Sequence, residues 1–157
     1  MCRLLSSKFI KLILGIFFLF LTPKLVLASE YIPRGYFVID LKNKIEWMTC
    51  PVGMVWNKNT CNGIAKKYEL RFLPDIINIA NKQLEGSWRL PTRNELESLI
   101  CIKCEKVKIN LKIFPKTPPE PFWTKDKNYW QPKFNWIVNF LNGNTSVSYT
   151  HLTLPTT

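Results

Sequence analysis

Four cysteines carry the most specific chemistry in this 157-residue sequence: Cys50, Cys61, Cys101 and Cys104. Thiols at these spacings could form disulfides, hold zinc or exchange electrons. The 11-residue spacing of the first pair argues against zinc. A redox Cys-x-x-Cys motif opens a helix, whereas this second pair closes one. We expect Cys50 to pair with Cys61, because the two enclose a compact loop that turns at residues 57–59. Cys101 and Cys104 either pair locally, or one of them reaches a strand elsewhere.

The residues that catalysis would need are scarce. His151 is the only histidine and lies near the end of the chain, so a catalytic triad lacks its base. Glu95 is expected to cap a helix, and Glu97 to lie on the exposed side of that helix. The sequence therefore predicts no catalytic residue, no metal site and no cofactor.

Lysines offer a different chemistry. Eight lysines stand against three acidic residues between Lys103 and Lys133. Apolar residues at 107, 109, 111 and 113 alternate with polar ones, which predicts an extended segment with Lys106, Lys108 and Lys112 on one side. Such a row would attract an acidic polysaccharide through many weak contacts. The alternative is a solvated face of a chain that is rich in lysine.

The N-terminus resembles an export signal. Basic residues precede an apolar run at residues 12–21, and small or aliphatic residues follow at 26–28. Ten apolar residues are too few to span a bilayer, so we expect cleavage after Ala28 and no membrane span afterwards. Residues 1–28 take four basic and no acidic residues from the net charge of +11, which leaves +7. An exported basic chain points to the periplasm or cell surface, where disulfides persist, and away from nucleic acid.

One stretch must position these groups. Thr92 and Glu95 form the pattern of a capping box, and Pro91 keeps the preceding residue out of a helix. Leu96, Leu99 and Ile100 then recur at helical spacing. We interpret the stretch as scaffold; its structural residues are Trp88, Arg89, Leu90, Pro91, Thr92, Glu95 and Leu96.

The remaining elements indicate an α+β fold. Residues 36–40 and 45–48 predict a hairpin, and a second helix is expected from Pro74 to about Leu84, ended by Gly86. A short strand is expected at residues 122–124. A further strand at 134–140 has Phe134, Trp136, Val138 and Phe140 on one face, followed by a turn at 142–143. Strands, two helices and then strands are typical of α+β proteins.

Five motifs together resemble one family: Glu46-Trp47-Met48-x-Cys50-Pro51 running to Cys61-Asn62-Gly63, Trp88-Arg89-Leu90-Pro91-Thr92, Ile109-Asn110-Leu111 running to Pro118, Phe122-Trp123-Thr124, and Trp136-x-Val138-x-Phe140-x-Asn142-Gly143. Residues 29–146 are similar to the Lcl C-terminal domain, an exported bacterial domain named after Legionella collagen-like adhesins. The resemblance implies a C-type-lectin-like fold with antiparallel strands, two helices and disulfide staples. It implies a binding module without catalytic residues, and it implies that Trp88, Leu90, Trp123 and Trp136 are core.

The chain departs from this pattern twice. The family ends on a strand resembling Tyr-x-Val-Arg-Cys-Val-Arg, whereas residues 147–157 resemble translated sequencing adapter. We therefore expect a non-native tail and a missing last strand. Calcium-dependent lectins carry Glu-Pro-Asn or Gln-Pro-Asp, but here Lys133 stands in place of the carboxylate, so calcium binding is not expected.

Two functions are compatible with these observations. The first is an exported adhesin-like module that binds acidic glycans or other polyanions. The second is a structural or protein-interaction domain of the cell envelope.

Overall fold

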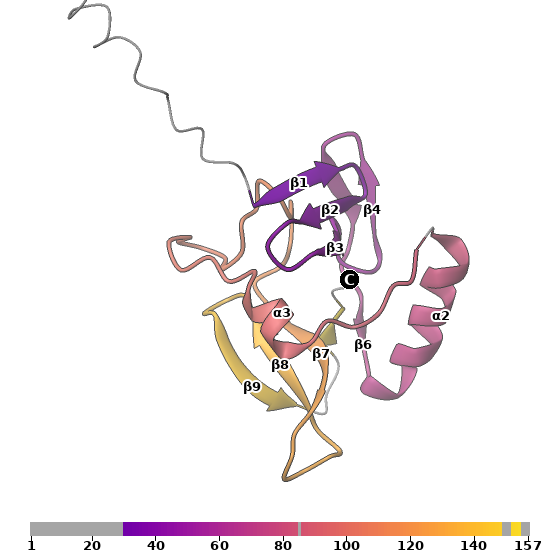
Figure 1. The fold of residues 1–157 in the computed structure, drawn as a ribbon, viewed down its shortest axis with the longest axis vertical. Coiled ribbons are helices and arrows are strands. Elements are labelled where there is room, and N and C mark those ends of the chain that lie inside the picture. Colours follow the sequence, from indigo (N-terminus) through magenta and orange to yellow (C-terminus); the bar gives the residue numbers. More distant parts are fainter. Residues whose placement is uncertain (1–29, 85, 149–151, 155–157) are drawn as a thin grey trace, which may run out of the picture.

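The computed structural model describes residues 30–84, 86–148 and 152–154, so the expected signal peptide lies outside the described residues. They form an α+β fold with three sheets and two helices, and the sheets are antiparallel except where β10 joins β7 (Figure 1). The first sheet has the order β1-β2-β3, the second pairs β4 with β5, and the third has the order β6-β10-β7-β8-β9. The strands are β1 (Tyr31–Arg34), β2 (Phe37–Asp40), β3 (Ile45–Met48), β4 (Met54–Asn57), β5 (Thr60–Gly63), β6 (Lys67–Tyr68), β7 (Pro121–Lys127), β8 (Asn135–Asn139), β9 (Asn144–Ser148) and β10 (Leu152–Thr153). No helix among these residues is both long and apolar enough to cross a membrane.

The predicted first hairpin is confirmed as β2–β3. Its turn is built around the buried carboxylate of Asp40. One oxygen of Asp40 accepts hydrogen bonds from the backbone N–H groups of Lys42 and Asn43, and the other accepts one from the indole of Trp47. A buried carboxylate needs such partners, and here the turn supplies them. The sequence had not indicated β1, which extends this sheet.

Both disulfides form within compact loops. Cys50 pairs with Cys61, with 5.6 Å between their Cα atoms, which confirms the prediction. The loop between them is the β4–β5 hairpin, with Lys58 in the left-handed conformation at its turn. Cys101 pairs with Cys104, so the local alternative is the one the structure adopts.

The two helices are α2 (Leu73–Gln83) and α3 (Arg93–Glu97), and a 3-10 turn at Leu70–Phe72 leads into α2. The predicted capping box is confirmed, because Thr92 Oγ1 accepts from the N–H of Glu95 and the Glu95 carboxylate accepts from the N–H of Thr92. Helix α3 ends sooner than its apolar pattern indicated, since Ser98 and Leu99 continue in turns. Leu96 and Leu99 are nevertheless buried.

The extended segment predicted for residues 106–113 is wrong. Only Ile109 makes a bridge, to Ile100, and the chain then turns. The carbonyl of Asn110 accepts from the N–H groups of Ile113 and Phe114, while its side-chain oxygen accepts from the N–H of Lys112. Asparagine closes turns by such local bonds, and these compete with strand pairing.

Strands β7 and β8 lie between two apolar clusters. Phe122 and Val138 are register partners in the first cluster, with Trp47, Leu96 and Phe140. Trp123 and Ile137 are the next pair along and face the second cluster, with Leu73, Leu90 and Leu154. The strand predicted at residues 134–140 is confirmed as β8, with Val138 and Phe140 in the same cluster. The opposite face is also covered, because Ile137 lies in the second cluster.

Two members of that expected apolar face differ in particular. Phe134 and Trp136 are half-buried. The guanidinium carbon of Arg93 lies over the ring of Trp136, 4.1 Å from the centre of that ring. Trp88, Leu90 and Trp123 are buried, as the family resemblance implied.

Part of the expected non-native tail lies in the sheet. Leu152–Thr153 pair with β6 on one side and β7 on the other, and the side chain of Leu154 is buried in the second cluster. The other tail residues from 149 onward lie outside the described residues. Whether residues 147–157 are foreign stays a prediction.

Candidate ligand-binding surfaces

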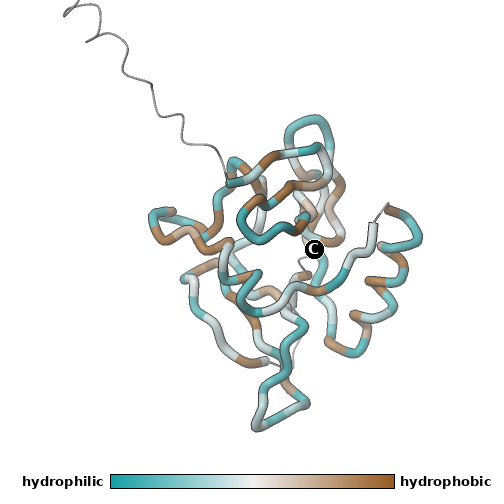
Figure 2. The backbone as a smooth tube through the Cα atoms, viewed as in Figure 1, coloured by the Kyte–Doolittle hydropathy of each residue, from teal (hydrophilic) through white to brown (hydrophobic). Residues whose placement is uncertain are grey.

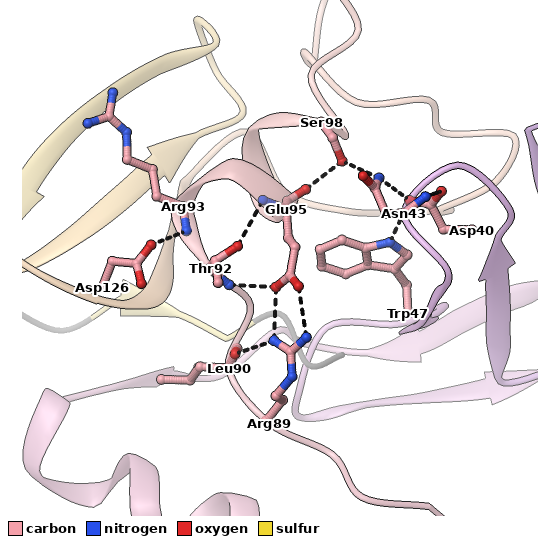
Figure 3. Close-up of polar contacts among 10 residues, drawn as sticks. All are labelled: Asp40, Asn43, Trp47, Arg89, Leu90, Thr92, Arg93, Glu95, Ser98 and Asp126. Atoms are coloured by element: carbon pink, nitrogen blue, oxygen red, sulfur yellow. Dashed lines mark hydrogen bonds and ion pairs between the residues drawn. The ribbon is translucent and has the colours of Figure 1, made fainter.

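The polar side chains from Arg89 to Ser98 form a connected hydrogen-bond network (Figure 3). Arg89 makes a two-pronged ion pair with Glu95, with both N–O distances at 2.8 Å. Hydrogen bonding from Arg89, opposed by partial burial and aided by Thr92, lowers the pKa of Glu95 to about 2. The Glu95 carboxylate already binds Arg89 and the N–H of Thr92, so it is unavailable to a ligand.

The same network joins helix α3 to the first hairpin. The side-chain amide of Asn43 donates to Asp40 and to the hydroxyl of Ser98, at 2.7 and 3.0 Å. The Ser98 hydroxyl in turn donates to the carbonyl of Glu95. Each of these polar groups has an internal partner, which supports the interpretation of the stretch as scaffold.

Glu97 is not on an exposed face, contrary to the prediction. Its carboxylate is half-buried and accepts from Arg93 at 2.7 Å and from Thr145 at 2.6 Å. Burial opposes its charge, yet the bonds from Thr145 and Arg93 hold the pKa of Glu97 below its ordinary value. The i, i+4 spacing of Arg93 and Glu97 is the local signal from which their pairing could be predicted. No local signal could indicate Thr145, which is 48 residues away.

The three predicted lysines do not form one row. Lys106 and Lys112 are exposed, but Lys108 is half-buried, and its ammonium donates to the carbonyl of Cys104 at 2.6 Å. Lys108 therefore closes the disulfide loop 101–104 and has less capacity for a ligand. Lys103 lies exposed in that loop, so the exposed lysines of this region are Lys103, Lys106 and Lys112.

The other lysines of the basic window lie elsewhere. Lys116 is exposed in a turn before β7. Lys125, Lys127 and Lys133 flank the loop between β7 and β8, which projects at the bottom of Figure 1. Lys67 is the one lysine within the described ranges that forms an ion pair, with Glu120 at 2.9 Å. The remaining ion pairs there use arginines. Three of the four ion pairs of the described residues therefore use an arginine, whereas Lys103, Lys106 and Lys112 are exposed and form none there.

A second surface is apolar. A groove of about 570 Å³ lies between α2 and the β4–β5 hairpin. Along α2, hydrophobic residues alternate with hydrophilic ones (Figure 2), and Ile76 and Ile79 line the groove from that side. Trp56 and Met54 line it from the hairpin. Its volume falls in the range of small-molecule sites, but few polar groups converge on it.

In the described part of the chain, no three His, Cys, Asp or Glu side chains gather where they could hold a metal ion. The available surfaces are a set of unpaired lysines and an apolar groove, carried on a disulfide-stapled α+β scaffold. The described residues thus define the class of a small, disulfide-stapled α+β domain.

Comparison with known families agrees with this class. The family model described as the Lcl C-terminal domain matches residues 36–155, so the chain belongs to the Lcl C-terminal domain family. The two disulfides and this membership fit an exported, adhesin-like extracellular domain. No curated protein and no solved structure matches the chain.

Proposed function

We propose that this protein is an exported, non-catalytic binding module whose ligand is an acidic polysaccharide or another extended polyanion. The observation that carries the proposal is the contrast between its cations. The arginines of the scaffold are paired, as Arg89 is with Glu95, while Lys103, Lys106 and Lys112 are exposed and have no carboxylate partner among the described residues. Exposed like charges raise the local potential and attract an oppositely charged polymer.

Two finer features belong to the same proposal. The order of a first hairpin, two helices and a late antiparallel sheet supports a C-type-lectin-like arrangement, in line with the family assignment. Binding would not use calcium, because Lys133 stands where such lectins carry a carboxylate. It would depend on many weak contacts, each screened by salt.

The test is retention of the exported chain on heparin resin compared with a neutral-sugar resin. Replacing Lys103, Lys106 and Lys112 with Gln should lower heparin affinity roughly tenfold at physiological salt and flatten its salt dependence. Lys108 is left intact because it closes the 101–104 loop.

A matched control removes the same charge from other faces. Lys42, Lys66 and Lys82 are also exposed, and their replacement with Gln should change retention much less. Equal losses in both variants would mean that net charge alone governs binding. No retention of the parent at physiological salt would overturn the proposal.

The apolar groove favours a second candidate, a protein-interaction domain of the cell envelope. Trp56 and Ile79 face this groove from two different elements, and large exposed apolar surfaces are common at protein interfaces. The heparin experiment separates the two candidates, because a groove-bound partner would not respond to the loss of the three lysines.

A further inference from the structure

The loop between β7 and β8 exposes two large aromatic side chains. Tyr129 and Trp130 are each 85% exposed, and their rings meet edge to face with centroids 5.1 Å apart. The loop projects away from the rest of the fold at the bottom of Figure 1. Aromatic side chains usually end in a core or an interface, so two at a projecting tip point to a partner.

Cations surround this tip. Lys125, Lys127 and Lys133 are exposed on the two arms of the loop. Asp126 is the only acidic residue in this segment, and its carboxylate is turned towards α3, where it accepts from the N–H of Arg93 at 2.7 Å (Figure 3). The tip therefore combines aromatic rings with positive charge.

Several backbone N–H groups of the tip already have hydrogen-bond partners. The side-chain oxygen of Asn128 accepts from the N–H groups of Trp130 and Gln131, at 2.9 and 3.0 Å. The N–H of Asn128 donates to the carbonyl of Phe134, and Pro132 has no N–H to satisfy. Moving this loop into a less polar medium would leave these donors satisfied, which lowers the free-energy cost of the transfer.

We propose that this loop docks the protein on the anionic surface of a lipid bilayer, with Tyr129 and Trp130 inserted at the headgroup level. Tyrosine and tryptophan favour that level because each has an apolar ring and a polar group. Lysines beside them add attraction to anionic lipid.

A sugar fits this tip less well. The two ring planes stand at 88° to each other, so they do not form one flat platform for a pyranose. The loop projects from the fold (Figure 1), whereas small-ligand sites are concave with converging polar groups. The lysines that the polyanion proposal uses are a different set, so the two proposals can fail separately.

The experiment measures binding of the exported chain to two kinds of vesicle. The anionic vesicles contain phosphatidylcholine and about a third phosphatidylglycerol, which gives a clear surface potential. The neutral vesicles contain phosphatidylcholine alone. The double variant Tyr129→Ser, Trp130→Ser should lose at least about tenfold in affinity for the anionic vesicles. Replacing Lys125, Lys127 and Lys133 with Gln should cost roughly fivefold per lysine on anionic vesicles and nothing on neutral ones. The matched control is Ile64→Ser, Ile102→Ser, which removes two equally exposed apolar side chains elsewhere and should not alter binding.

Three results would overturn the proposal. The first is a parent chain that does not bind anionic vesicles, and the second is a double variant that binds them as well as the parent does. The third is a double variant that loses heparin retention as strongly as vesicle binding, which would assign the rings to a polysaccharide. Thermal melting of each variant checks that the fold is intact, as expected for exposed positions.

Discussion

Helices α2 and α3 differ in a way that their sequences do not suggest. Helix α2 has 11 residues and a regular apolar face, yet Leu73 is the only residue it buries fully. Helix α3 has five residues, buries Leu96 completely and joins two sheets through its polar side chains. The capping box and the ion pair of Arg89 with Glu95 stabilise the start of this helix. The length and amphipathicity of a helix therefore do not determine how fully its side chains are buried. In this protein the long-range contacts of the helix determine it.

The two helices also differ in what holds them to the fold. Helix α2 is tied to the segment before α3 by Asn81, whose side chain exchanges two hydrogen bonds with the backbone of Trp88. On its other side lies the apolar groove. Helix α3 is held by contacts to both neighbouring sheets, whereas one side of α2 lines the apolar groove.

Truncating one apolar side chain in each helix tests the difference in burial. Leu96→Ala should lower the free energy of unfolding by about 3 kcal/mol, because it leaves a cavity beside Val38 and Phe140. Ile79→Ala should cost under about 0.5 kcal/mol, because Ile79 is 52% exposed. Chemical denaturation of both variants measures this. Equal losses would show that α2 is packed as firmly as α3.

The ion pair makes the stability of α3 depend on pH. The pKa of Glu95 is about 2 in the folded chain and near its ordinary value of 4.5 when unfolded. A lowered folded pKa gives stability that is complete above pH 4.5 and is lost as the pH falls towards 2. After allowance for the partly exposed arginine, about 1 to 2 kcal/mol should be lost across this window.

The variant Arg89→Gln isolates this contribution. It removes the largest cause of the lowered pKa, so the fall in stability between pH 4.5 and 2 should become shallower. Unfolding curves collected at several pH values below 5 would show it. An unchanged slope would mean that other carboxylates, and not Glu95, carry the acid sensitivity.

The smallest effect concerns the cap. Thr92→Ala should cost about 1 kcal/mol, because the N–H of Glu95 loses its acceptor. Thr92→Ser keeps the hydroxyl and should stay within a few tenths of a kcal/mol of the parent. A Thr92→Ala variant that melts with the parent would show that the ion pair alone positions the helix.

Local signals in the sequence determined several parts of this protein. Thr92 and Glu95 predicted the helix start, residues 36–48 predicted the first hairpin, and Cys50 with Cys61 predicted a closed loop. The Asn142-Gly143 turn was also correct, and Gly143 there has a φ of +79°, which favours glycine. Each of these features depends on residues close together in the chain, so their types and spacing carry the information.

Only the tertiary structure decided the rest. The expected row of lysines disappeared because Asn110 closes a turn and Lys108 binds the carbonyl of Cys104. Trp136 lies under Arg93 instead of in the core, and Glu97 meets Thr145 from a distant strand. The exposure of Tyr129 and Trp130 likewise could not be predicted from the sequence, because two aromatic residues next to a strand are equally compatible with a buried position. These contacts depend on which residues from distant parts of the chain come to lie beside a side chain. The spacing of residues along the sequence does not contain that information.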